Sequence, residues 1–282
     1  MNALEIHNLT KSFAGFKLDD VSLTLPSGCI MGLIGENGAG KSTTIKLILD
    51  ILHKDSGTVT LLGRDNGDNI RLTKEEVGVV LDDVGIPECL TAKQVGRVMQ
   101  NTFRNWDGRT YAGLLQKFSL PADKPFKAFS RGMKMKLGIA VAMSHGSRLL
   151  LLDEATNGLD PVVRDEVIGM FGEFTRDEDH SILLSSHIVS DLEKICDYVA
   201  FLHDGRLLLC EEKDQLLAEY GMLHCTAEQL AALDPAAVRS KKESPYGVEA
   251  IVQRSAVPTG TVLSPVSLED VFLFMVKEGE TA

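Results

Sequence analysis

The sequence predicts an α/β protein with a largely parallel sheet, flanking helices, an inserted helical subdomain and a small C-terminal α+β appendix. Three observations predict it. Short apolar segments of strand character alternate along the chain with longer amphipathic segments. A glycine-rich loop at residues 35–42 joins one of these strands directly to a helix. The segment between residues 83 and 148 is helical in character.

The N-terminal segments predict three strands and a helix. The first strand is expected at the edge of a sheet, because its apolar residues alternate with polar ones at Leu4, Ile6 and Leu9. A second strand is predicted at Val21–Leu25, and a third at Cys29–Ile34, whose nearly continuous apolar run is typical of a buried strand. A helix is expected from about Lys41 to Leu52.

The middle of the chain changes from helical to alternating character. Amphipathic stretches at Ala92–Phe103 and Tyr111–Phe118 predict helices of the inserted subdomain, which we place at about residues 83–148. Strand patterns return at Arg148–Leu152, Ser181–Ser185 and Tyr198–Leu202, with helical stretches between them. We therefore expect one large domain over residues 1–220.

Residues 221–282 are expected to form a small accessory region. A polar segment, Ser240–Pro245, interrupts the pattern between short strands predicted at Met222–Thr226 and Val248–Gln253. A final helix is predicted after Ser267, which has the spacing of a capping box with Asp270. The apolar stripe of this helix is formed by Leu268, Val271, Phe272 and Met275.

Composition excludes several classes of protein. The 282 residues carry a formal charge of -11, so we expect no direct binding of nucleic acid. The N-terminus has no signal-peptide pattern, and no apolar run is long enough to span a bilayer. The five cysteines form no Cys-x-x-Cys pair, which argues against a zinc site or a disulfide framework.

The glycine-rich loop has the pattern of a phosphate-binding loop (Walker A). Gly35-Glu-Asn-Gly-Ala-Gly-Lys-Ser42 fits G-x-x-x-x-G-K-[ST], with a strand before it and a helix after it. Its backbone N–H groups and the helix N-terminus would hold phosphate oxygens, Lys41 would reach the β- and γ-phosphates, and the Ser42 hydroxyl would bind Mg²⁺. The predicted ATP-binding residues of this loop are Gly35, Asn37, Gly38, Gly40, Lys41, Ser42 and Thr43.

A second acidic element follows about a hundred residues later. The strand Leu149–Leu152 is followed directly by Asp153 and Glu154. Asp153 is placed to orient a metal ion and its waters, and Glu154 to polarise an attacking water. After a phosphate loop, this pattern favours a nucleotide-hydrolysing site over a plain core strand.

With these motifs in order, residues 1–215 resemble the ATP-binding cassette (ABC) family. The segment Phe129-Ser-Arg-Gly-Met133 resembles the family signature Leu-Ser-Gly-Gly-Gln, with matches at Ser130 and Gly132. Phe129, Arg131 and Met133 depart from that consensus. The resemblance implies that Ser130 and Gly132 contact the γ-phosphate held by a second subunit.

The resemblance implies roles for further residues. Asn157-Gly-Leu-Asp160 looks like the D-loop of the dimer interface, so Asp160 is a candidate nucleotide contact. His187 looks like the switch histidine that contacts the γ-phosphate. Phe13 lies where the family has an aromatic residue stacked on adenine, although Phe16 is a competing candidate.

One departure affects the metal site. Where the family usually has a glutamine, before the helical subdomain, this chain has Asp82 or Asp83, depending on the alignment. We assign Asp82, together with Ser42 and Asp153, to the Mg²⁺ site. A carboxylate can bind Mg²⁺ directly or through water.

The resemblance implies an ATPase that acts as a pair of cassettes, most simply a homodimer, because one chain does not complete the site. It also implies a separate transmembrane permease subunit and a place on the cytoplasmic face of the membrane. Two other classes remain open: a soluble ABC protein of DNA repair or translation, and a non-hydrolysing nucleotide-binding regulator. A long coiled coil, a second cassette or zinc cysteines would indicate the former, and loss of Glu154 or His187 the latter.

The short cassette and the Ser267-Leu-Glu-Asp-Val-Phe segment are similar to bacterial export ATPases, including bacitracin-resistance and phenol-soluble modulin exporters. This implies export of peptides or antimicrobial compounds, with import still open. The substrate is chosen in the membrane subunit and is not read from a cassette.

Overall fold

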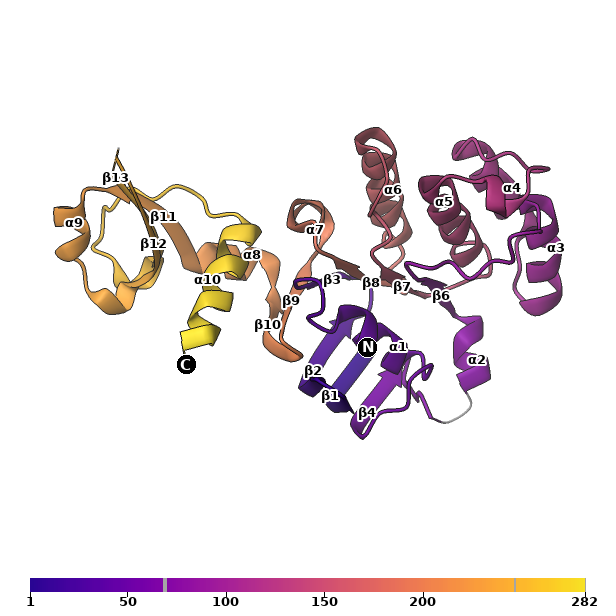
Figure 1. Ribbon diagram of the computed structural model, residues 1–282, viewed down its shortest axis with the longest axis horizontal. Helices are drawn as coiled ribbons and strands as arrows, with labels where there is room; N and C mark the ends of the chain where they lie inside the picture. Colours follow the sequence, from indigo (N-terminus) through magenta and orange to yellow (C-terminus); the bar gives the residue numbers. More distant parts are fainter. Residues whose placement is uncertain (68–69, 246, 282) are drawn as a thin grey trace.

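The computed structural model describes residues 1–67, 70–245 and 247–281, so Ala282, the end of the expected accessory region, lies outside the described residues. Figure 1 shows an elongated molecule. Two sheets and their helices form the larger part, and a small sheet with α9 forms the other end. The C-terminal helix α10 lies between these two parts (Figure 1).

The central sheet has the strand order β10-β9-β3-β8-β7-β6. Strand β3 pairs in parallel with β8 and β9, β7 pairs in parallel with β6 and β8, and β10 closes the edge in antiparallel pairing. The four strands predicted for this region are confirmed, with ends that differ by one residue at most. The bounds are β3 Ile30–Ile34, β6 Val77–Val80, β7 Leu149–Asp153, β8 Ser181–Ser186, β9 Tyr198–His203 and β10 Arg206–Glu212.

The second sheet is antiparallel, with the order β2-β1-β4-β5. Its bounds are β1 Asn2–Phe13, β2 Phe16–Pro26, β4 Ser56–Leu61 and β5 Arg64–Asp65. The expected position of the first strand at a sheet edge is wrong, because β1 lies between β2 and β4. Alternation shows that one face of a strand is buried, but it carries no information on how many neighbours the strand has.

Helix α1 (Lys41–Ile48) packs between the two sheets and ends earlier than expected. The chain leaves the helix at Asp50, whose φ of 52° is left-handed and incompatible with a further helical turn. Ile45 and Ile48 pack in a core cluster with β1 and with alternate residues of β7 and β8. This packing fixes the start of α1 against the central sheet.

The helical subdomain packs on the opposite face of the central sheet, next to α6 and α7 (Figure 1). Thr91 and Gln94 form a capping box at the start of α3. The helices before and within this layer are α2 Ile70–Glu75, α3 Ala92–Thr102, α4 Gly108–Lys117, η1 Phe126–Ala128, α5 Arg131–Ala142, α6 Pro161–Phe174 and α7 Val189–Ile195.

The small C-terminal sheet has the antiparallel order β11-β13-β12. The expectation that Ser240–Pro245 breaks the pattern is wrong for most of that segment, because residues 240–244 belong to β12. Lys241 and Lys242 are exposed on this strand, and charged side chains are typical of an edge strand. The elements here are α8 Lys213–Glu219, β11 Tyr220–Cys225, α9 Ala227–Ala231, η2 Pro235–Ala237, β12 Val238–Ser244, β13 Gly247–Gln253 and η3 Arg254–Ala256.

Helix α10 (Leu268–Thr281) returns to the cassette. The predicted capping box is confirmed: Ser267 N donates to Asp270 Oδ2 at 3.0 Å, and Asp270 N donates to Ser267 Oγ at 3.1 Å. The ring of Phe272 meets that of Phe201 edge-on, with centroids 5.3 Å apart. In the described part of the chain, no helix combines the length and the apolar character needed to cross a membrane.

Candidate nucleotide-binding site

The carboxyl ends of the parallel strands place the candidate residues at one edge of the central sheet. The phosphate loop follows β3, Glu154 follows β7 and His187 follows β8. The register aligns these ends, because Asp153 pairs with Ser185 and Ile34 pairs with Ser186. Ligands of open parallel sheets bind at this edge.

A cavity of about 440 Å³ lies at this edge. It brings together nine of the residues predicted for the site, the competing aromatic candidate Phe16, and two residues that were not assigned to the site. The predicted residues are Asn37, Gly38, Gly40, Lys41, Ser42, Thr43, Asp82, Glu154 and His187; the others are Phe16, Glu36 and Asn157.

The loop of residues 35–42 requires glycine at two points. A Cβ added to Gly35 would lie 2.4 Å from the Leu202 carbonyl oxygen, so only glycine fits between β3 and β9 here. Gly40 has a φ of 110° and precedes α1 without a side-chain cap. The first-turn N–H groups of α1 are therefore not capped by a side chain, which favours an anion such as phosphate at this end.

Lys41 is buried within the loop, with 5% of its surface exposed. Its Nζ donates to the carbonyl oxygens of Gly35 at 2.7 Å and Glu36 at 3.1 Å. It also lies 3.4 Å from Glu154 Oε1. A buried ammonium group is stable only with such partners, so Lys41 is a fixed positive charge at the cavity wall.

Asp153 and Glu154 have different environments. Asp153 is 2% exposed, and its Oδ1 accepts a hydrogen bond from Ser185 Oγ at 2.6 Å. Glu154 N donates to Ser185 Oγ and to the Ser185 carbonyl oxygen, both at 3.1 Å. Glu154 has a φ of 52°, a strained conformation for a residue with a side chain. Ser185, which the sequence analysis missed, therefore orients both acidic residues.

His187 contacts Glu154 directly, with 2.7 Å between His187 Nδ1 and Glu154 Oε2. Its side chain is 40% exposed and lines the cavity. Lys41, Glu154 and His187 form a continuous series across the cavity wall. Such a series can hold a nucleophilic water near a phosphate, which is the requirement of phosphoryl transfer.

Asp82 and Asp83, the two candidates for the position where the family usually has a glutamine, have different environments. Asp82 lines the cavity with Lys41 and Ser42. Asp83 Oδ1 instead accepts from Gly85 N at 3.2 Å, within its own turn, and does not line the cavity. Asp82 Oδ1 also accepts a hydrogen bond from the Arg131 guanidinium at 2.7 Å, a contact that the sequence analysis did not anticipate.

The donor set fits Mg²⁺. The Ser42 hydroxyl and the Asp82 carboxylate line the cavity, and Asp153 lies buried directly before Glu154. Among the described residues, no three His, Cys, Asp or Glu side chains form a metal cluster. One hydroxyl and one or two carboxylates are the protein ligands that Mg²⁺ usually takes, with water and phosphates supplying the rest.

Six predicted residues do not line the cavity of their own chain, and three of these, Ser130, Gly132 and Asp160, lie at the starts of α5 and α6. Ser130 caps α5, with its Oγ accepting from Met133 N at 3.3 Å, and Gly132 lies in the first turn of the same helix. Asp160 caps α6 in the same manner, accepting from Val163 N at 3.1 Å. None of the three lines the cavity.

The two aromatic candidates for adenine stacking lie side by side on the β1–β2 hairpin. Phe13 is 42% exposed, and its ring centroid is 6.3 Å from that of Phe16. Phe16 lines the cavity and packs close to Gly40, where an added Cβ would lie 3.0 Å from its ring. Phe16 is therefore part of the cavity wall, and Phe13 is the more accessible ring.

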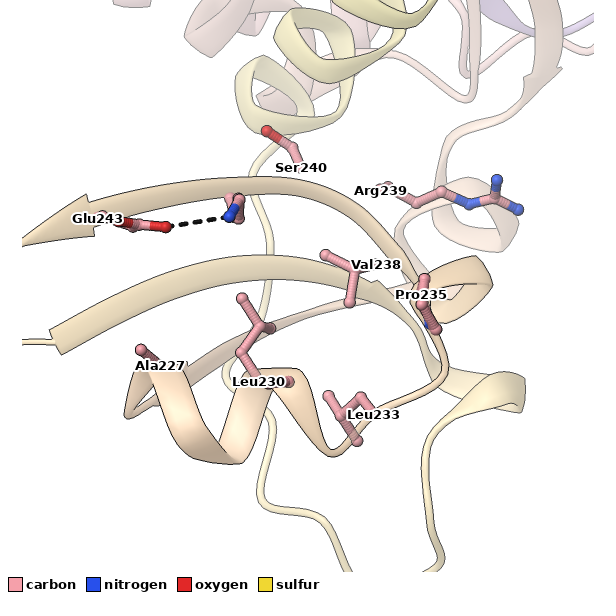
Figure 2. A pocket seen from close by; sticks show the side chains of 10 residues that line it. Ala227, Leu230, Leu233, Pro235, Val238, Arg239, Ser240 and Glu243 are labelled. Atoms are coloured by element: carbon pink, nitrogen blue, oxygen red, sulfur yellow. Dashed lines mark hydrogen bonds and ion pairs between the residues drawn. The ribbon is translucent and has the colours of Figure 1, made fainter.

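A second cavity, of about 520 Å³, lies in the C-terminal region (Figure 2). Leu230, Leu233 and Val238 lie between α9 and the strands, as Figure 2 shows. The ion pair of Lys241 and Glu243, at 3.0 Å, lies on its rim. Although this cavity has the larger volume, it has no glycine-rich loop at a helix N-terminus, and its lining combines half-buried apolar side chains with exposed polar ones.

Comparison with known proteins agrees with this geometry. The ABC transporter family model matches residues 18–157. The lantibiotic transport ATP-binding protein SrtF of Streptococcus pyogenes is 36% identical over 214 residues, which cover 75% of this chain and 91% of that protein. The bacitracin transport ATP-binding protein BcrA of Enterococcus faecalis is 33% identical over 208 residues, covering 73% of this chain and 68% of that protein.

A solved structure of an ATP-binding subunit of an ABC transporter superposes with a TM-score of 0.70 and 28% identity, covering 77% of this chain and 92% of that one. The predicted fold class and the resemblance to bacitracin-transport ATPases are thereby confirmed. The phosphate loop, the signature segment and the acidic strand end lie within residues 18–157, whereas Asp160 and His187 follow them. The chain belongs to the ABC transporter family, as one of its ATP-binding subunits with ATPase activity.

Proposed function

We propose that the chain hydrolyses Mg²⁺–ATP as one of two identical cassettes and powers a separate membrane permease that exports peptides or antimicrobial compounds. The observation that carries this proposal is the cavity that holds Lys41, Ser42, Glu154 and His187 at the carboxyl edge of a parallel sheet. The phosphate loop and the helix N-terminus bind the phosphates, as described for such loops.

The roles of the residues follow from their contacts. Lys41 offsets charge on the β- and γ-phosphates, and Ser42, Asp82 and Asp153 hold Mg²⁺. When bound, Mg²⁺ adds positive charge beside the phosphates. Glu154 accepts a proton from the attacking water, and His187, hydrogen-bonded to Glu154, keeps that carboxylate oriented.

The proposed homodimer is supported by the residues that lie outside the cavity. Ser130, Gly132 and Asp160 carry family motifs, but they do not line the cavity of their own chain. The dimer allows them to reach the nucleotide of the second copy. Two-fold pairing of identical surfaces is also the commonest form of association.

An apolar groove supports the proposed permease contact. A cavity of about 470 Å³ lies between the end of α1, β6 and the helices α3 and α5. Ile51 and Val98 on its rim are exposed. His145 lies buried in its wall, where burial lowers the pKa of the imidazole below its usual value. The groove is suited to a short amphipathic helix of a membrane subunit, which would place the chain at the cytoplasmic face of the membrane.

The export of peptides or antimicrobial compounds is proposed from relatives. SrtF is a lantibiotic transport protein and BcrA a bacitracin transport protein, and both match the cassette of this chain over at least two thirds of their own length. The substrate contacts lie in the permease, so the cassette itself supplies no further selectivity.

Two experiments test the proposal. The purified chain should hydrolyse ATP only with a divalent cation, and Glu154→Gln should bind ATP without turnover. Affinity purification of the tagged Glu154→Gln chain from membranes with ATP should recover a polytopic membrane protein. A chain that binds ATP but shows no hydrolysis, alone or in membranes, would instead support a nucleotide-binding regulator.

A further inference from the structure

Asp82 lies on the border between two cavities. It lines the nucleotide cavity together with Lys41 and Ser42. It also lines a neighbouring cavity of about 390 Å³ between the loop of residues 82–88 and the start of α5. The Asp82 side chain is therefore within reach of both cavities.

In this structure the Asp82 carboxylate is turned toward the 390 Å³ cavity, which Arg131 also lines. Its Oδ1 accepts a hydrogen bond from Arg131 Nη2 at 2.7 Å, and the side chains of both residues are 57% exposed. The two residues are 49 positions apart in the sequence, so the contact joins the loop after β6 to the start of α5. Both are also departures from the family pattern, and their opposite charges cancel.

Arg131 is held in place by more than this ion pair. It is the first residue of α5, between Ser130 and Gly132. Its side chain lies over Gly158, where an added Cβ would be 3.3 Å from Arg131 Cδ and 3.5 Å from Nε. Gly158 follows Asn157, which lines the nucleotide cavity. The stem of Arg131 therefore rests against Gly158 on one side, while the side chain as a whole stays 57% exposed.

We propose that Arg131 is a positioning residue that competes with Mg²⁺–ATP for the Asp82 carboxylate. The inference rests on the proposed function, because it requires Mg²⁺–ATP in the cavity that Asp82 lines. Arg131 holds the Asp82 carboxylate away from the nucleotide cavity. Binding of Mg²⁺–ATP breaks this ion pair and releases the carboxylate. The Asp82–Arg131 ion pair thus links the nucleotide cavity of each chain to residues 130–132 of the same chain.

The exposure of the pair makes this exchange feasible. An ion pair between exposed side chains is weak, because water screens it and both side chains lose freedom. A divalent cation has twice the charge of a guanidinium and prefers carboxylate oxygen. A buried pair would resist the exchange, whereas this one costs the nucleotide only a small part of its affinity.

The test measures binding of nucleotide to the full chain in a Glu154→Gln background, where ATP is not consumed. Titration calorimetry gives the Kd of ATP with Mg²⁺ and, separately, with EDTA. Arg131→Ala should lower the Kd for Mg²⁺–ATP about two- to fivefold, the range expected for an exposed ion pair. The Kd for ATP in EDTA should not change, because Arg131 does not line the nucleotide cavity.

Lys134→Ala is the matched control for loss of a positive charge. Lys134 lines the same 390 Å³ cavity as Arg131, but its Nζ lies over the ring of Phe126, 4.9 Å from the centroid. We expect no metal-dependent change in this variant. The decisive comparison repeats Arg131→Ala in an Asp82→Ala background, where the effect should disappear because the carboxylate is gone.

Each outcome decides the inference. An unchanged Kd in Arg131→Ala, an equal gain in Lys134→Ala, or a gain that persists without Asp82 would overturn the competition while leaving the proposed function intact. Failure of the Glu154→Gln chain to bind Mg²⁺–ATP at all would overturn the proposed function itself. The result that supports the inference is a metal-dependent gain specific to Arg131 and dependent on Asp82.

Discussion

The inner and outer halves of the nucleotide site are built differently. In the inner half, Lys41 and Asp153 are nearly inaccessible, and Ser185 bonds to the strand end that carries the acidic residues. In the outer half, Asp82 and Arg131 are mostly exposed, and their ion pair joins the loop after β6 to the start of α5. The inner half is fixed by the packing of one chain, whereas the outer half is accessible to a nucleotide and to a second copy.

This difference predicts how substitutions should behave. A change in the inner half removes a group that the sheet has already oriented, so it should affect chemistry strongly. A change in the outer half alters a solvated contact, so it should affect affinity modestly. The predictions below test this contrast from the largest expected effect to the smallest.

Lys41→Ala should lower ATPase activity by at least about 100-fold, the range found when one preorganised electrostatic group is removed from an active site. ATP affinity should also fall, because Lys41 is the buried cation of the loop. Both are measured on the purified variant by phosphate release and by calorimetry. Turnover near that of the parent chain would remove Lys41, and the inner half with it, from the mechanism.

Ser185→Ala should lower activity less, and it should also destabilise the fold. The substitution deprives the buried Asp153 carboxylate of its donor and Glu154 N of one acceptor. Leaving a buried polar group unsatisfied costs about 1–3 kcal/mol, measurable by urea unfolding. Ser186→Ala is the matched control on the same strand, since its hydroxyl accepts from Ile188 N instead. Equal losses in the two variants would show that Asp153 needs no orienting bond.

Phe13→Ala should weaken ATP binding by at least about fivefold, since stacking of a base on an aromatic ring contributes about 1–3 kcal/mol. GTP and ATP should be affected alike, because stacking does not read base edges. Phe16→Ala tests the alternative, because Phe16 lines the cavity and packs on Gly40. If only Phe16→Ala weakens binding, adenine stacks on the inner ring.

The residues of the inner half could be singled out from the sequence because their signals are local. A strand, a glycine loop and a helix are consecutive, and so are the apolar strand and Asp153–Glu154. Parallel pairing then brings the carboxyl ends of β3, β7 and β8, and the residues that follow them, to one edge of the sheet. Ser185 was missed because a serine inside an apolar strand has no distinguishing pattern, and its role depends on the register between β7 and β8.

The outer half was less accessible to sequence reasoning because its contacts are not local. The pairing of Asp82 with Arg131 joins a loop to a helix start that only the fold brings together. The position of β1 inside its sheet and the strand β12 were also missed, since both depend on pairing between distant segments. Apolar periodicity indicates which face of a strand is buried, but which strands pair with each other depends on contacts between distant segments.

The central claim is that one chain holds a complete inner half and needs a second copy to complete the outer half. Size-exclusion chromatography with light scattering on Glu154→Gln tests it most directly. With Mg²⁺–ATP the variant should elute at twice the mass that it has with EDTA, and Lys41→Ala should remain at the single mass. A Glu154→Gln chain that binds Mg²⁺–ATP and yet stays at the single mass, with or without residues 221–282, would contradict the account.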